Sequence, residues 1–107
     1  MSDAGHLHLC AAADVAEGMI RRVSAQGYEP LAVCRIDGRV HLFADTCSHG
    51  MASLSEGEIE EGQIFCPFHG GAFDVVTGMP TERPCTLPIA VYQAIERDGD
   101  LYVAARG

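Results

Sequence analysis

The sequence contains two short segments in which a cysteine and a histidine stand close together and a glycine follows. The first reads CSHG at residues 47–50, and the second reads CPFHG at residues 66–70. Sixteen residues separate His49 from Cys66. Each segment offers one thiolate and one imidazole, so a metal centre that uses both segments would tie two distant parts of the chain together. No other feature of the sequence constrains the fold as strongly.

Two kinds of metal centre use such ligands. A mononuclear zinc site takes the same side chains, but its sequence signature usually pairs Cys with Cys and His with His. A mixed pair on each of two loops favours a two-iron, two-sulfide cluster. In that arrangement Cys47 and Cys66 bind one iron, whereas His49 and His69 bind the other. The glycine after each histidine allows the backbone to approach the inorganic core closely.

The residues around both segments resemble the Rieske-type [2Fe-2S] ferredoxins of bacterial aromatic ring-hydroxylating dioxygenase systems. The stretch CSHGMASLSEG at 47–57 is similar to the first cluster loop of that family, and CPFHGGAFDVVTG at 66–78 is similar to the second. The stretches LCAAADVAEGMIRRV and GMPTERPCTLPIAV are most similar to the ferredoxin of carbazole dioxygenase systems.

The resemblance implies one Rieske-type [2Fe-2S] cluster bound by the two cysteines and two histidines, and no catalytic residue. It implies a one-electron carrier between an NAD(P)H-dependent flavoprotein reductase and a terminal ring-hydroxylating oxygenase, rather than an enzyme. It also implies a cytoplasmic protein, and we expect a monomer. The residues expected to surround the cluster are Gly50, Met51, Phe68, Gly70, Gly71, Phe73 and Pro84.

Two of these positions predict a low redox potential. High-potential Rieske proteins carry a serine and a tyrosine two and four residues after the second histidine ligand, and their hydroxyls donate hydrogen bonds to the cluster. Gly71 and Phe73 stand at those places here and have no hydroxyl. We therefore expect a midpoint near the low end of the Rieske range, about −150 mV.

The hydrophobic periodicity predicts a small antiparallel all-β barrel or sandwich with a two-loop cluster-binding subdomain. Asp37-Gly38 and Arg97-Asp98-Gly99 are hairpin signals. Ala12–Glu17 is a helix-like segment too short to be stable alone. The expected strands are Leu7–Cys10, Met19–Val23, Leu31–Ile36, Arg39–Phe43, Gln63–Cys66, Ala72–Val75, Ile89–Glu96 and Asp100–Ala104.

Length and charge set further bounds. A chain of 107 residues predicts one domain over 1–107, with the cluster-binding subdomain at approximately 45–76. The net charge of −8 argues against a nucleic-acid partner, because a phosphate backbone requires a basic face. No apolar run reaches the roughly 20 residues that span a membrane, and the N-terminus has no secretory leader pattern.

Two other functions stay open at this point. One is a small Rieske-like subunit of a nitrite reductase or of another multi-subunit oxidoreductase, although such relatives often lack the cluster ligands. The other is a zinc-binding interaction module. An acidic run at residues 56–61 has two interpretations, a solvated face or a docking surface for basic residues of a partner.

Overall fold

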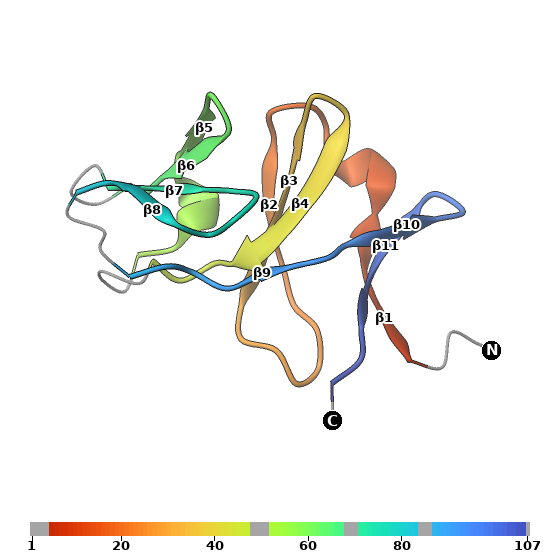
Figure 1. The fold of residues 1–107 in the computed structure, drawn as a ribbon. Helices are drawn as coiled ribbons and strands as arrows, with labels where there is room; N and C mark the ends of the chain where they lie inside the picture. The colour runs from red at the N-terminus through yellow and green to blue at the C-terminus, as the bar shows by residue number, and fades with distance from the viewer. Residues whose placement is uncertain (1–4, 48–51, 68–70, 84–86, 107) are drawn as a thin grey trace.

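The computed structural model describes residues 5–47, 52–67, 71–83 and 87–106, and it confirms the all-β prediction (Figure 1). Eleven strands form three antiparallel sheets in this described part. The first sheet has the order β1-β11-β10, the second β2-β3-β4-β9 and the third β5-β6-β7-β8. In Figure 1 the third sheet lies at one end of the molecule, and both chain termini lie toward the other.

The strand bounds agree with most of the predicted segments. The first sheet contains β1 His6–Ala11, β10 Ile95–Arg97 and β11 Asp100–Ala104. The second contains β2 Ile20–Val23, β3 Leu31–Ile36, β4 Arg39–Ala44 and β9 Val91–Tyr92. The third contains β5 Glu58–Glu60, β6 Gln63–Phe65, β7 Ala72–Asp74 and β8 Pro80–Glu82. Two turns of 3-10 helix complete the described elements, η1 Ala12–Asp14 and η2 Leu54–Glu56.

One predicted strand, Ile89–Glu96, is divided between two sheets. Its first part forms β9, which pairs with β4, and its last part forms β10, which pairs with β11. The prediction of one continuous strand was wrong, because alternation along a segment does not reveal which neighbour each half pairs with. This crossing connects the second sheet to the first.

The strands β5 and β8 were not predicted. The acidic run carries β5, in which the single apolar residue Ile59 is half-buried between two exposed glutamates. At the other edge, β8 begins with Pro80, and proline is tolerated in edge strands because an outer backbone position needs no hydrogen-bond donor. Pairing with β6 and β7 therefore overrides weak local signals in both edge strands.

Three hairpins use the same two-residue turn. Asp37-Gly38, Glu61-Gly62 and Asp98-Gly99 all have positive φ at both positions. This backbone suits the type I′ turn, whose twist matches that of the flanking strands. The first and third turns agree with the predicted hairpins. The second was missed, because Glu is not a residue that marks such turns.

The central part of the second sheet, in β3 and β4, is buried on both faces and separates two hydrophobic cores. Along β3, Ala32 and Cys34 face one core, whereas Leu31 and Val33 face the other. We call the two groups the loop-side core and the far core. The loop-side core contains Ala32, Cys34, Phe43, Cys47, Ala52, Leu54, Ile64, Cys66, Phe73, Val75 and Ile89. The far core contains Cys10, Ala12, Val15, Val23, Leu31, Val33, Leu42, Leu101 and Val103.

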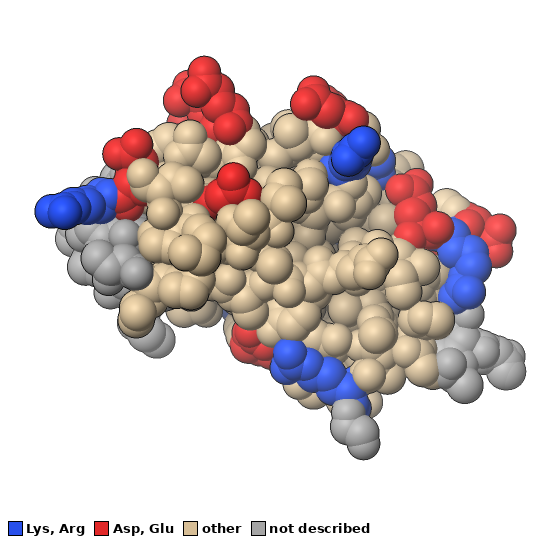
Figure 2. Space-filling model, in the orientation of Figure 1, with Lys and Arg blue, Asp and Glu red and all other residues tan. Residues whose placement is uncertain are grey.

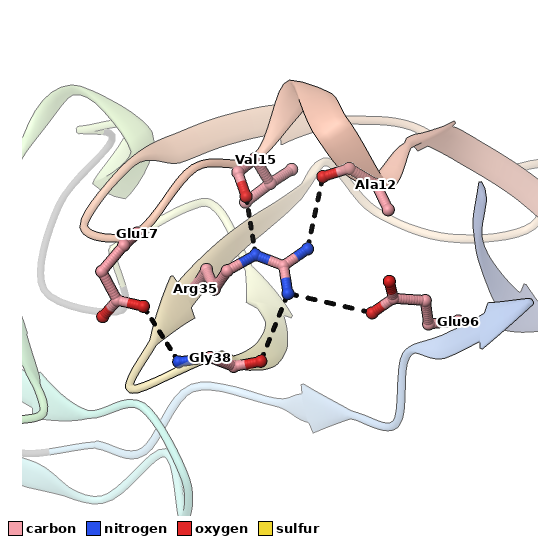
Figure 3. Close-up of polar contacts among 6 residues, drawn as sticks. All are labelled: Ala12, Val15, Glu17, Arg35, Gly38 and Glu96. Atoms are coloured by element: carbon pink, nitrogen blue, oxygen red, sulfur yellow. Dashed lines mark hydrogen bonds and ion pairs between the residues drawn. The ribbon is translucent and has the colours of Figure 1, made fainter. Parts of the chain in front are cut away.

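The β3–β4 hairpin is fastened to the segment that includes η1 (Figure 3). The Arg35 guanidinium donates to the carbonyls of Val15 at 2.7 Å and Ala12 at 3.3 Å. In the opposite direction the Glu17 carboxylate accepts the backbone N–H groups of Asp37 and Gly38. These two amide hydrogen bonds hold the pKa of the Glu17 carboxyl below its usual value. Only Ala12–Asp14 of the helix-like segment forms a 3-10 turn, and Val15 and Glu17, which follow the turn, bind the hairpin.

Among the described residues there is no helix with the length and apolar character needed to span a bilayer.

Candidate metal centre

Cys47 lies at the base of a loop that is closed by backbone contacts. An isolated bridge pairs Thr46 with Ser53 in antiparallel fashion. Inside this pair, the Cys47 N–H donates to the carbonyl of Ala52 at 2.9 Å. The two ends of the loop are therefore adjacent in space, and Cys47 lies at one of them.

Cys66 lies at the base of a second loop with the same closure. Here β6 and β7 pair Phe65 with Ala72, and the Cys66 N–H donates to the carbonyl of Gly71 at 2.7 Å. In both loops the cysteine amide thus bonds the carbonyl of the fifth residue that follows. Two loops built alike place two thiols at equivalent backbone positions, which suits ligands that bind one ion from two sides.

The structure brings both cysteines into the loop-side core. Cys47 is 2% exposed and Cys66 is 5% exposed, so both sulfurs lie at the inner end of the site. Iron of an iron–sulfur cluster prefers thiolate ligands in such water-excluded surroundings. The two buried cysteines at this end of the molecule therefore fit the thiolate ligands that a [2Fe-2S] cluster would need.

Two of the predicted surrounding residues are described. Gly71 is buried, and Phe73 is fully buried on β7 opposite Ile64 on β6. The aromatic ring at this position contributes apolar packing to the core and carries no hydroxyl group. The other predicted site residues lie outside the described residues: His49, His69, Gly50, Met51, Phe68, Gly70 and Pro84.

One buried charge beside the first loop was not found by sequence reasoning. Asp45 is 1% exposed, although it follows β4 directly. Its carboxylate accepts hydrogen bonds from the Ser53 hydroxyl and from the Ser55 N–H at 2.7 Å. The Arg22 guanidinium lies 3.6 Å from it, and 61% of that arginine side chain is exposed. The available signal was an acid at the end of an apolar strand with Ser-x-Ser eight residues later, and this pattern names no ligand.

The structure describes two cysteines that were not assigned to iron, Cys10 and Cys34. Burial raises the pKa of the Cys10 thiol and raises that of Cys34 to about 12. Both side chains therefore remain neutral thiols at physiological pH. Cys85, the fifth cysteine, lies outside the described residues.

Acidic side chains gather over the β5–β6 hairpin, along the upper edge of Figure 2. The three glutamates of this hairpin, Glu58, Glu60 and Glu61, are all exposed. The same sheet continues through β6 and β7 into the second loop, so this acidic surface belongs to the part of the molecule that carries the candidate ligands.

Comparison with known proteins identifies this architecture. The sequence model of the Rieske [2Fe-2S] domain matches residues 5–93. The chain belongs to the Rieske [2Fe-2S] domain family. Its cofactor is therefore a Rieske-type [2Fe-2S] cluster, and the prediction of this cofactor is confirmed.

Relatives within the Rieske family define the subgroup. Ferredoxin CarAc of Metapseudomonas resinovorans is 51% identical over 98 residues, which cover 92% of each protein. The anthranilate 1,2-dioxygenase ferredoxin subunit of Burkholderia cepacia is 44% identical over 77 residues, covering 72% of this chain and 71% of that subunit. The first relative is a ferredoxin and the second is the ferredoxin subunit of a dioxygenase, which agrees with the resemblance.

A solved structure shows the same Rieske fold. In a complex of reduced oxygenase and oxidized ferredoxin of carbazole 1,9a-dioxygenase, one chain superposes with a TM-score of 0.87 and 49% identity. The match covers 95% of this chain and 94% of that one. The predicted likeness to carbazole dioxygenase ferredoxin is thus confirmed in sequence and in fold.

Proposed function

We propose that this protein is a low-potential Rieske ferredoxin that carries single electrons from an NAD(P)H-dependent flavoprotein reductase to a terminal aromatic ring-hydroxylating dioxygenase. The observation that carries the proposal is the matched pair of loops, each closed by a cysteine amide, with Cys47 and Cys66 meeting in one core. The high identity to ferredoxin components of dioxygenase systems supports the two partners.

The proposal assigns Cys47 and Cys66 to one iron and His49 and His69 to the other. The bound cluster supplies a site that accepts and releases one electron. The buried thiolates stabilise the inner iron in the ferric state, because sulfur donates strongly. Neutral imidazoles donate less, so the electron is expected on the histidine-bound iron.

The remaining assignments follow from the same proposal. Residues 45–76 form the cluster-binding part of a single domain. Gly50, Met51, Phe68, Gly70, Gly71, Phe73 and Pro84 surround the cluster. Contacts with both partners are short-lived, and interfaces of electron-transfer proteins are small, below about 1,200 Å² in total. A monomeric, cytoplasmic carrier meets these needs.

Electron paramagnetic resonance of the dithionite-reduced protein tests the ligand assignment. We expect the spectrum of a mixed histidine–thiolate [2Fe-2S] centre, and we expect His49→Ala to lose this signal together with its iron. His8→Ala is the matched control, because His8 is an exposed histidine on β1 that contacts Asp100. A His49→Ala protein that retains the spectrum would refute the assignment.

Reconstitution tests the role as a carrier. The holoprotein is mixed with a flavoprotein ferredoxin reductase, NAD(P)H and a terminal ring-hydroxylating oxygenase, and oxidation of an aromatic substrate is measured. We expect turnover to depend on this protein and to increase with its concentration until the oxygenase is saturated. Turnover that is equal without the protein would argue against the carrier function.

A further inference from the structure

Asp45 carries a buried charge that has no role in the proposed function. It is the one buried charged side chain among the described residues, with 1% of its surface exposed. A buried carboxylate is unfavourable unless hydrogen bonds and counter-charges compensate it. The residues that compensate it belong to the base of the first loop, which connects this charge to the cluster.

The hydrogen-bond partners of Asp45 lie just after that loop, where the chain re-enters the fold. The Ser53 hydroxyl donates to one carboxylate oxygen, and the Ser55 N–H donates to the other at 2.7 Å. The Asp45 backbone adds a contact, since the Asp45 carbonyl accepts the N–H of Leu54 at 2.6 Å. Ser53 is also half of the bridge that closes the loop, so the carboxylate fixes the loop where it re-enters the fold.

The second loop lacks this arrangement. Its equivalent position, two residues before Cys66, is Ile64, which is fully buried in the loop-side core. The two loops are closed by the same kind of backbone contact but are supported differently. Hydrogen bonds and an ion pair of Asp45 support the first loop, whereas apolar packing of Ile64 supports the second. The charge is therefore not a requirement of the closure itself.

The position of Asp45 places its charge near the cluster. It stands two residues before Cys47, so the Cα atoms of the two residues lie no more than about 7 Å apart. Reduction adds one electron to the cluster, so a negative charge held beside a proposed cluster ligand opposes it. In a protein interior such a repulsion changes an equilibrium about tenfold or more. Arg22 offsets only part of this charge, because its side chain is largely exposed to solvent.

We propose that Asp45 is a positioning residue for the cluster, which closes the base of the first loop and whose charge keeps the potential low. The proposal rests on the ligand assignment given above. It adds a source of low potential that is independent of the missing hydroxyl groups at Gly71 and Phe73. Its partner Arg22 acts in the opposite direction and weakens the effect.

The test is a potentiometric titration of holoprotein variants, with the reduction equilibrium as the readout. Asp45→Asn keeps the shape and can still accept from Ser55, but it removes the charge. We expect its equilibrium to shift toward the reduced form about tenfold, which equals about 59 mV for one electron. Asp98→Asn is the matched control, because Asp98 is exposed in the β10–β11 turn, and it should stay within twofold of the wild type.

Ser53→Ala separates the hydrogen bond from the charge. It removes one donor to Asp45 and leaves the carboxylate in place, so we expect faster cluster loss and a reduction equilibrium within twofold of the wild type. The spectrum of each reduced variant shows whether the ligands are unchanged.

An Asp45→Asn protein with the wild-type spectrum and an equilibrium within twofold of the wild type would overturn the proposal, and so would an equal shift in Ser53→Ala. If Asp45→Asn cannot hold the cluster, the Arg22→Gln variant tests the effect of the Asp45 charge instead. This variant should shift the equilibrium toward the oxidised form, and an unchanged equilibrium would overturn the proposal. None of these negative results would alter the spectrum of the wild type, which tests the ligand assignment separately.

Discussion

The two cores of this protein differ in what completes them. The far core is closed by apolar side chains from long strands, including β1 and β11. The loop-side core lies against a sheet of three-residue strands and includes Cys47 and Cys66, the proposed thiolate ligands of the cluster. Strands this short have little stability of their own. From this difference we expect that one half of the domain carries its own stability, whereas the other half depends on its cofactor.

The largest expected effect of this difference follows iron removal. Without the cluster, the third sheet loses the link between its two loops, so β5–β8 should lose most of their protection against amide hydrogen exchange. The amides of β1 and β11 should stay at least tenfold better protected than those of β6 and β7. Exchange measured by mass spectrometry on holo- and apo-protein checks this. Equal protection in both sheets of the apo-protein would contradict the comparison.

Truncating one buried side chain in each core tests the comparison of the two cores more closely. Phe73→Ala and Leu101→Ala both remove fully buried apolar groups, and each should lower the free energy of unfolding by about 3–5 kcal/mol. Only Phe73→Ala should also shorten the half-life of the cluster, by about fivefold or more, because Phe73 packs in the core that holds the cysteines.

The measurements are denaturant unfolding and the decay of visible absorbance. Equal rates of cluster loss in the two variants would show that cluster retention tracks overall stability instead of the loop-side core.

A hydroxyl added to the loop-side core should raise the redox potential. Phe73→Tyr supplies the donor that we expect in high-potential Rieske proteins, and one hydrogen bond to a charged group is worth about 1.5–3 kcal/mol. The midpoint should therefore rise by up to roughly 130 mV. Tyr102→Phe, which removes a hydroxyl from β11, is the control and should leave the midpoint unchanged. A titration that finds no rise in Phe73→Tyr would contradict the expectation.

Charge reversal compares the two ends of the molecule as docking surfaces. Glu61 and Asp98 are both exposed at the first position of a type I′ turn, Glu61 in the third sheet and Asp98 in the first. Glu61→Lys should slow electron transfer to the oxygenase severalfold at low salt, whereas Asp98→Lys should not.

The effect should disappear at high ionic strength, because exposed charges are then screened. Stopped-flow rates at two salt concentrations provide the measurement. Equal slowing by both variants would point to net charge in place of a local docking surface.

The smallest effect is expected at the buried thiols. In the holoprotein at pH 8, Cys34 should not react with iodoacetamide, because its pKa of about 12 leaves a thiolate fraction near 10⁻⁴. Cys10 should react slowly as well, since burial also raises its pKa. After iron removal, Cys34 in the loop-side core should become reactive before Cys10 in the far core. Peptide mass spectrometry distinguishes the two, and the reverse order would contradict the comparison.

The sequence by itself determined the cofactor and most of the strands. Two Cys–His segments favour a [2Fe-2S] cluster over zinc through ligand chemistry, which can be recognised without the fold. Alternation and Asp-Gly turns locate the hairpins at Asp37 and Asp98, because both signals act within a few residues.

The tertiary structure alone decided the features that depend on distant neighbours. It pairs the edge strands β5 and β8 with the third sheet, and it divides Ile89–Glu96 between two sheets. It also buries Asp45 against Ser53 and Ser55, whereas Ile64 stands at the matching place in the other loop. Strand pairing and burial depend on which distant segments pack together, and this cannot be read from a short stretch of sequence.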